Sequence, residues 1–115
     1  MDTRDELLID LINRAEMERS GPRLAVLTHG AVITGRIAAQ RDWAVEVAAR
    51  LRDSDPLVER FAEDFDGEAA GPRDCPPAFL HLRDCQLVSG EWTLPAAFGE
   101  FFRVPLSAIS AWSAR

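Results

Sequence analysis

Apolar residues near the N-terminus recur at the spacing of one face of a helix. That face carries five of them, Leu7, Leu8, Leu11, Ile12 and Ala15. Thr3 and Glu6 have the spacing of a capping box, in which each side chain binds the backbone N–H of the other residue. Gly21-Pro22 then places glycine and proline where helices commonly end. The pattern predicts an N-terminal helix over residues 2–19.

The next segment reads as a β-hairpin, because two short runs rich in apolar and β-branched residues flank His29-Gly30. Two residues are the length of a tight hairpin turn, and Gly30 tolerates the positive φ that such a turn requires. Gly35 interrupts the second run. A glycine inside a strand marks a bulge, a sharp bend or the close approach of another backbone. We therefore expect a bent hairpin over residues 24–39, with structural rather than ligand-binding roles for Gly30 and Gly35.

A helical insert is predicted over residues 42–66. Asp42 can cap a first helix, and Asp55-Pro56 combines an N-cap with proline at the first helical position of a second. Residues 66–77 hold glycine and proline and predict a loop. One face of the second helix is expected to carry three apolar residues, Leu57, Phe61 and Phe65.

The remaining strands are predicted within residues 78–113. Residues 79–88 indicate a long strand, and residues 101–104 indicate a further strand. Residues 105–108 indicate a single turn and residues 109–112 a final short strand.

This element order predicts an α+β protein. The expected core is a small, strongly bent antiparallel sheet or barrel of the Sm-like or SH3-like type, with an N-terminal helix and a helical insert. A flatter sheet with helices on one face is the alternative. The chain has 115 residues, which fits a single domain over residues 1–115.

Composition narrows the classes of function. The formal net charge is −6, and all 13 basic residues are arginines with carboxylates nearby, so a nucleic-acid partner is not expected. No apolar stretch approaches the roughly 20 residues that span a bilayer, so no membrane segment is expected. The acidic N-terminus lacks a basic segment leading into an apolar one, and the chain has two cysteines. These features predict a cytoplasmic protein.

The residues that could support chemistry do not form a recognisable site. His29 is expected at the hairpin tip, and His81 is expected to be half-buried and hydrogen-bonded. Alternation along a strand places Asp84 on the face opposite His81, and it places Cys85 on the same face but about 13 Å away. Cys75 lacks the neighbouring ligands that a zinc site requires. We expect no catalytic residue, no cofactor and no metal.

Three aromatic residues are candidates for a protein interface. Trp92 lies beside a glycine and a proline-containing loop, where it either is exposed or covers the open end of the sheet. Phe101 and Phe102 are adjacent in a strand, so alternation turns one of them away from the core. An unpaired strand edge invites pairing with another chain, which predicts a homo-oligomer. If the insert helices cover this edge, the protein is instead a monomer.

Three segments together resemble the gas vesicle accessory protein U family. They are residues 27–37 (LTHGAVITGRI), residues 79–85 (FLHLRDC) and residues 102–112 (FRVPLSAISAW). The resemblance implies a non-enzymatic accessory protein that associates with gas vesicles or their shell protein and influences assembly or clustering. The alternative function is a small ligand-binding or enzymatic domain. Its pocket would lie between the insert helices and the sheet, lined by His81, Arg83 and carboxylates.

Overall fold

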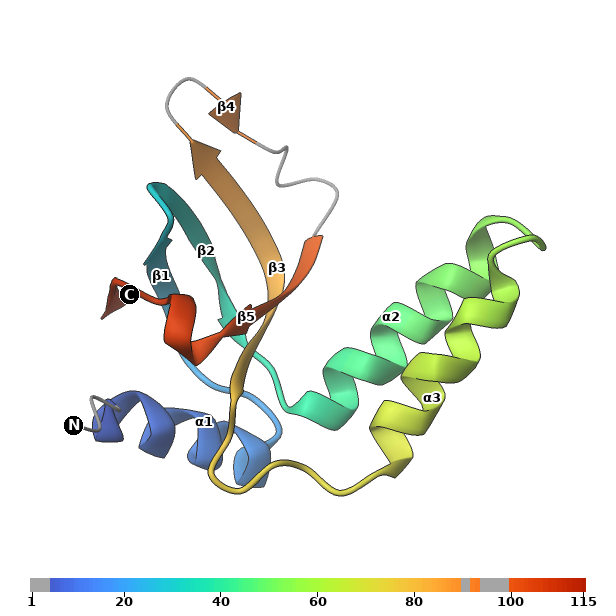
Figure 1. Ribbon diagram of the computed structural model, residues 1–115, viewed down its shortest axis with the longest axis horizontal. Coiled ribbons are helices and arrows are strands. Elements are labelled where there is room, and N and C mark those ends of the chain that lie inside the picture. The colour runs from blue at the N-terminus through green and yellow to red at the C-terminus, as the bar shows by residue number, and fades with distance from the viewer. Residues whose placement is uncertain (1–4, 90–91, 94–99) are drawn as a thin grey trace.

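The computed structural model describes residues 5–89, 92–93 and 100–115, with only the backbone described at residues 89, 92 and 93. The chain combines helices and strands in an α+β arrangement, as the sequence predicts (Figure 1). In chain order the elements are α1 (Glu6–Glu18), β1 (Arg23–Thr28), β2 (Ala31–Ile37), α2 (Gln40–Ser54), the 3₁₀ turn η1 (Glu59–Phe61), α3 (Ala62–Ala70), β3 (Phe79–Ser89), β4 (Trp92–Thr93), β5 (Glu100–Pro105), the 3₁₀ turn η3 (Leu106–Ala108) and β6 (Ala111–Ala114).

The strands form one antiparallel sheet in the order β4-β3-β2-β1-β6, with β5 also paired to β3. The long strand β3 therefore has β2 along one side and both β5 and β4 along the other. The turn η3 carries the chain from β5 to β6 at the opposite edge of the sheet. Among the described residues no pairing joins β5 to β6, so closure into a barrel is not confirmed.

The turn between β1 and β2 is the two-residue turn that the sequence predicts. Thr28 pairs with Ala31, and the two residues between them have positive φ, 49° at His29 and 80° at Gly30. A turn of this kind requires positive φ at both central residues. Strand β2 runs without interruption through Gly35, but its register with β3 shifts there, between Thr34 and Arg36. Of the roles expected for this glycine, the close approach of another backbone applies, because a Cβ at Gly35 would lie 3.1 Å from the Arg83 carbonyl oxygen.

The extra residue of this irregularity lies in β3. Thr34 pairs with Gln86 and Arg36 pairs with Arg83, so a span of two residues in β2 lies opposite a span of three residues in β3. The register between β3 and β5 shifts at the same place. Asp84 is the extra residue and has a φ of 52°. A bulge of this kind bends a strand and increases its twist.

Helix α1 begins at Glu6, and Asp5 rather than Thr3 serves as its N-cap. The Asp5 side chain accepts a hydrogen bond from the Leu8 backbone N–H at 3.1 Å, which satisfies one of the free donors of the first turn. Thr3 lies outside the described residues. At the other end the left-handed C-cap position, with φ 66°, is taken by Arg19 and not by the predicted glycine.

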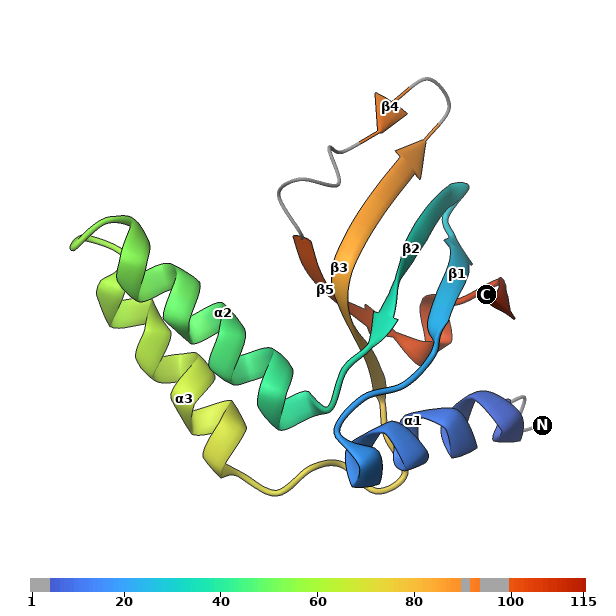
Figure 2. The same ribbon diagram turned by 180° about the vertical axis from the view of Figure 1, so that it is seen from behind.

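Helices α2 and α3 form a hairpin that extends away from the sheet (Figures 1 and 2). Helix α2 begins at Gln40 after the N-cap Ala39, so the prediction of Asp42 as the cap is wrong. Asp42 lies in the first turn, where its carboxylate pairs with Arg19. Helix α3 continues to Ala70, which corrects the predicted loop from residue 66. The final strand begins at Ala111, two residues later than predicted.

The two faces of the sheet bury different apolar clusters. The inner face packs against α1, and its cluster contains Leu8, Ile12, Ala15, Leu24, Val26, Ile33, Ile37, Leu80, Leu82, Cys85 and Val104. Among the described residues, the base of the helical hairpin packs on one end of the outer face. The second cluster contains Ala38, Trp43 and Ala44, with Val47, Phe65, Ala69 and Phe101 partly buried against it. The hairpin is therefore joined to the sheet through this second cluster.

Candidate functional site

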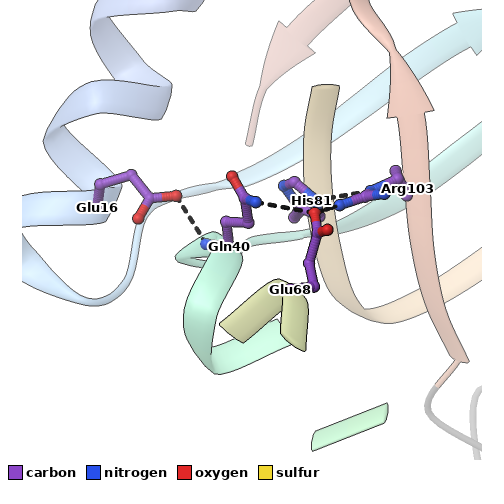
Figure 3. Close-up of polar contacts among 5 residues, drawn as sticks. All are labelled: Glu16, Gln40, Glu68, His81 and Arg103. Carbon is purple, nitrogen blue, oxygen red and sulfur yellow. Dashed lines mark hydrogen bonds and ion pairs between the residues drawn. The ribbon is translucent and has the colours of Figure 1, made fainter. Parts of the chain in front are cut away.

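Five polar residues meet where the helical hairpin, the sheet and the end of α1 come together (Figure 3). We call this set the junction. It consists of Glu16, Gln40, Glu68, His81 and Arg103. Glu16 comes from α1, Gln40 and Glu68 from the helical hairpin, and the other two from neighbouring strands.

His81 lies at the centre of the junction and is only 4% exposed. It is on the outer face of β3, whereas Leu80 and Leu82 on either side are fully buried in the inner cluster. Its Nε2 accepts a hydrogen bond from Arg103 Nε at 2.9 Å, so the neutral ring carries its proton on Nδ1. Burial lowers the pKa of His81 from 6.5 to about 4, opposed in part by the charge of Asp74. The imidazole is therefore neutral at neutral pH.

Arg103 connects this histidine to the helical hairpin. Its guanidinium also forms an ion pair with Glu68, whose Oε1 accepts a second hydrogen bond from Gln40 Nε2 at 2.8 Å. The guanidinium carbon lies 5.2 Å from the ring centroid of Trp43 and 4.7 Å from that of Phe79, within the range of cation–π attraction. Burial lowers the pKa of Arg103 from its ordinary value. One side chain thus contributes polar and aromatic contacts on both sides of the hairpin–sheet boundary.

Glu16 completes the junction from α1. Its Oε1 accepts a hydrogen bond at 2.6 Å from the backbone N–H of Gln40, in the first turn of α2. Negative charge at the start of a helix is favourable because the first backbone N–H groups lack partners within the helix. The donors and acceptors of the junction are thus largely engaged with one another. This arrangement positions the elements that meet at the junction.

The cysteines do not pair with the histidine. The bulge at Asp84 moves Cys85 onto the inner face, so the prediction that Cys85 shares a face with His81 is wrong. Burial raises the pKa of the Cys85 thiol to about 12, which keeps it protonated and unreactive. Cys75 is a free, exposed thiol. Among the described residues, no group of three histidine, cysteine or acidic side chains is close enough to hold a metal ion.

A cleft of about 160 Å³ lies between α2 and the sheet, beside the junction. Its lining includes Arg83, Asp42 and Glu46, but His81 is not part of it. Pockets for small ligands usually have volumes of roughly 300–1,000 Å³. The cleft therefore gives little support to the alternative of a ligand-binding or enzymatic pocket. The full lining of the cleft between α2 and the sheet consists of Arg19, Ala38, Asp42, Trp43, Val45, Glu46, Arg83 and Phe101.

The predicted interface residues occupy three different settings. The side chain of Trp92 lies outside the described residues. Phe101 is half-buried on the outer face, where the guanidinium of Arg50 lies 4.6 Å from its ring centroid. Phe102 is half-buried against the inner cluster. The two phenylalanines therefore point to opposite faces, as alternation predicts, and each has partners within the chain.

Sequence reasoning missed the junction because its members are far apart along the chain. Arg103 is 22 residues from His81 and 35 residues from Glu68. The alternation of residues 79–82 placed His81 opposite two leucines, and this was the only local signal for the junction. The sequence also placed Leu57 and Phe61 on one face of a helix that starts at Asp55-Pro56, but α3 begins only at Ala62. Leu57 and Phe61 precede it and are 83% and 58% exposed.

The described part of the chain has no helix that is both long enough and apolar enough to cross a membrane. The fold and the junction together define a small α+β protein in which a helical hairpin is attached to an antiparallel sheet. The chain belongs to the family described as gas vesicle protein GvpU-like, whose model matches residues 5–115. The expected family resemblance is thereby confirmed. No curated protein matches the chain. No solved structure matches it either.

Proposed function

We propose that this chain is a non-enzymatic gas vesicle accessory protein that binds other proteins and influences the assembly or clustering of vesicles. The observation that carries the proposal is the family match over residues 5–115. The junction supports a role without catalysis, because its polar groups are engaged with one another. The proposed partner is a gas vesicle shell protein, and the proposed location is the cytoplasm.

The proposed contact with the shell protein is the far tip of the helical hairpin. Leu57 and Phe61 lie there, between the main parts of α2 and α3, and they are 83% and 58% exposed. Phenylalanine is enriched at protein interfaces, and Leu57 adds further exposed apolar surface at the tip. The tip projects away from the sheet, which leaves it accessible to a large particle (Figures 1 and 2).

Flotation with purified gas vesicles tests the proposal. Gas vesicles are buoyant, so centrifugation carries bound protein to the surface and leaves free protein below. We expect the wild-type protein to float with the vesicles. Each of the two side chains contributes more than about 1 kcal/mol, so Leu57→Ser combined with Phe61→Ser weakens binding by at least roughly tenfold.

The matched control is Leu7→Ser, which removes a 61% exposed leucine from α1, away from the hairpin tip. This variant should float like the wild type. Wild-type protein that stays below the vesicles would contradict the accessory role itself. Equal flotation of all three proteins would leave the role intact and rule out the hairpin tip as the contact.

The protein also self-associates, in this proposal, through the edge formed by β5. Within residues 5–89, 92–93 and 100–115, strand β5 pairs with β3 alone, and a strand edge without a partner favours pairing with another chain. Phe101, Phe102 and Trp92 are the proposed contacts. Light scattering at micromolar concentration should give a mass above 12.7 kDa. A monomer that Phe101→Ser and Phe102→Ser leave unchanged would contradict this part of the proposal.

A further inference from the structure

The sheet register aligns arginines across the outer face. Arg23 in β1 pairs with Arg36 in β2, which pairs in turn with Arg83 in β3. Arg115 lies next to this line, because its backbone N–H donates to the Arg23 carbonyl at 2.8 Å. We call these four residues the arginine row. Alternation along β3 places Arg83 on the same outer face as His81, before the bulge at Asp84.

Four positive charges in one row are unfavourable unless something compensates them, because like charges directly opposite each other destabilise a sheet. Among the described residues, the ion pairs of arginine use Arg14, Arg19, Arg52 and Arg103, and none uses the arginine row. Arg36 donates from Nη1 to the backbone carbonyl of Gly21 at 3.1 Å.

Arg83 adds an independent observation, because its Nε is buried and has no hydrogen-bond partner among the described residues. A buried donor of a charged group is costly when it lacks an acceptor. The arginine row is therefore a line of positive charge that can attract an anionic group, with Asp42 offsetting part of the charge of Arg83. Guanidinium groups are well suited to carboxylates, because the two planar groups can form paired hydrogen bonds.

An apolar hollow of about 260 Å³ lies on the same sheet, nearer the β1–β2 turn. Leu27 pairs with Val32 on one side and with Ala111 on the other, and Leu27 is 38% exposed. Leu27 lies four residues after Arg23 in β1, a distance of about 13 Å along the strand. That separation is close to the diameter of an α-helix with its side chains, about 10–12 Å. The lining consists of Ala25, Val26, Leu27, Val32, Ala111, Trp112 and Ser113.

We propose that the arginine row and the apolar hollow together bind an amphipathic helix of a protein partner, with carboxylates along one flank and apolar residues along the other. The surface is a sheet face and not an edge, so side chains rather than backbone groups make the contacts. The net charge of −6 and the apolar hollow both disfavour a nucleic acid. Asp42 and Glu46 in the neighbouring cleft limit how far acidic groups can extend past Arg83. This surface is independent of the gas vesicle role.

Fluorescence anisotropy with the full-length protein tests the proposal. The probe is a labelled synthetic helix with a leucine stripe flanked by glutamates, and the control probe carries lysine in place of each glutamate. We expect the glutamate peptide to bind, with an affinity that falls as salt is raised. Arg36→Gln and Arg83→Gln should each weaken binding about tenfold or more. Leu27→Ser should weaken it without changing the salt dependence.

Arg60→Gln is the matched control, because Arg60 is an exposed arginine in the helical hairpin, outside the arginine row. It should bind like the wild type. Arg36→Lys keeps the positive charge but cannot form paired hydrogen bonds with a carboxylate. Partial binding by this variant would show that the loss in Arg36→Gln comes from the missing charge and not from misfolding.

Several results would overturn the proposal. Equal affinity for the lysine peptide, or unchanged binding by both glutamine variants, would remove its basis. Tighter binding of a thymidine oligonucleotide through the arginine row would make the occupant a nucleic acid. Loss of self-association in Arg83→Gln, together with no peptide binding, would make the occupant a second copy of this chain.

Discussion

Replacing Gly35 by alanine should destabilise the protein, because the added methyl group has no space. A Cβ at this position would lie 2.8 Å from Cys85 Sγ, 3.1 Å from the Arg83 carbonyl oxygen and 3.2 Å from Leu82 Cβ. Favourable contacts between such atoms lie at roughly 3.5–4.0 Å. All three contacts are on β3 at its bulge, where Cys85 and Leu82 are fully buried and cannot move aside. Overpacking of this kind costs about 1–3 kcal/mol.

Urea denaturation followed by circular dichroism measures this loss as a lower midpoint with an unchanged slope. Thermal melting should show a decrease of roughly 4–12 °C for a domain of this size. Gly67→Ala is the matched control, because Gly67 lies inside α3 with nothing within 4 Å of an added Cβ. That variant should gain about 0.5–1 kcal/mol from helix propensity.

Making the same substitution in a Cys85→Ala protein tests whether the Cys85 thiol is the contact that causes the loss of stability. In Cys85→Ala the nearest clashing atom is gone, so adding Gly35→Ala should cost less there than in the wild type. The reasoning fails if Gly35→Ala unfolds at the same urea concentration as the wild type. An equal cost in both backgrounds would show that the Cys85 thiol is not the limiting contact.

Four further predictions concern the junction, the two thiols and metal binding. The folded protein favours the neutral imidazole of His81, whose pKa is lowered to about 4, so its contribution is complete above pH 6.5 and is lost as the pH falls toward 4. Over that window the wild type should lose on the order of 3 kcal/mol more in urea denaturation than His81→Gln, and parallel profiles would contradict this. Iodoacetamide should label Cys75 in the folded protein and Cys85 only after unfolding, as peptide mass spectrometry would show. Arg103→Met should speed amide hydrogen exchange in α2 and α3 more than in α1; uniform exchange would mean that Arg103 does not hold the helical hairpin. Treatment with EDTA should leave the melting temperature unchanged, and stoichiometric zinc in the purified protein would contradict that expectation.

Local sequence patterns were sufficient to predict the elements in which each face has the same surroundings along its whole length. The apolar spacing that predicted the first helix matches the burial of Leu8, Ile12 and Ala15 in α1, whereas Leu7, placed on the same face, is 61% exposed. The long strand predicted at residues 79–88 is β3, with one further residue. The turn at His29-Gly30 was predictable because its conformation depends on two residues alone.

The bulge in β3 was not predictable from the same alternation. It is specified by pairing with two neighbouring strands, both distant in sequence, and Asp84 itself carries no bulge signal. This one residue reverses the orientation of everything after it, which is why the predicted face of Cys85 was wrong. The cap of α2 was missed for a related reason, because Asp42 is engaged by Arg19 across 23 residues. Helix α3 extends past the predicted loop start because Gly67 is accommodated within it.

The attachment of the helical hairpin makes it a mechanical lever. Helix α2 has 15 residues and is therefore about 22 Å long, and it is held at one end by the junction. A rotation of about 10° at that end displaces the far tip by roughly 4 Å, given that length. A change at Arg103 or His81 too small to disturb the sheet therefore alters where Leu57 and Phe61 are presented. The reach of the hairpin tip toward the proposed partner therefore depends on the angle of the helical hairpin, which the contacts at the junction help to hold.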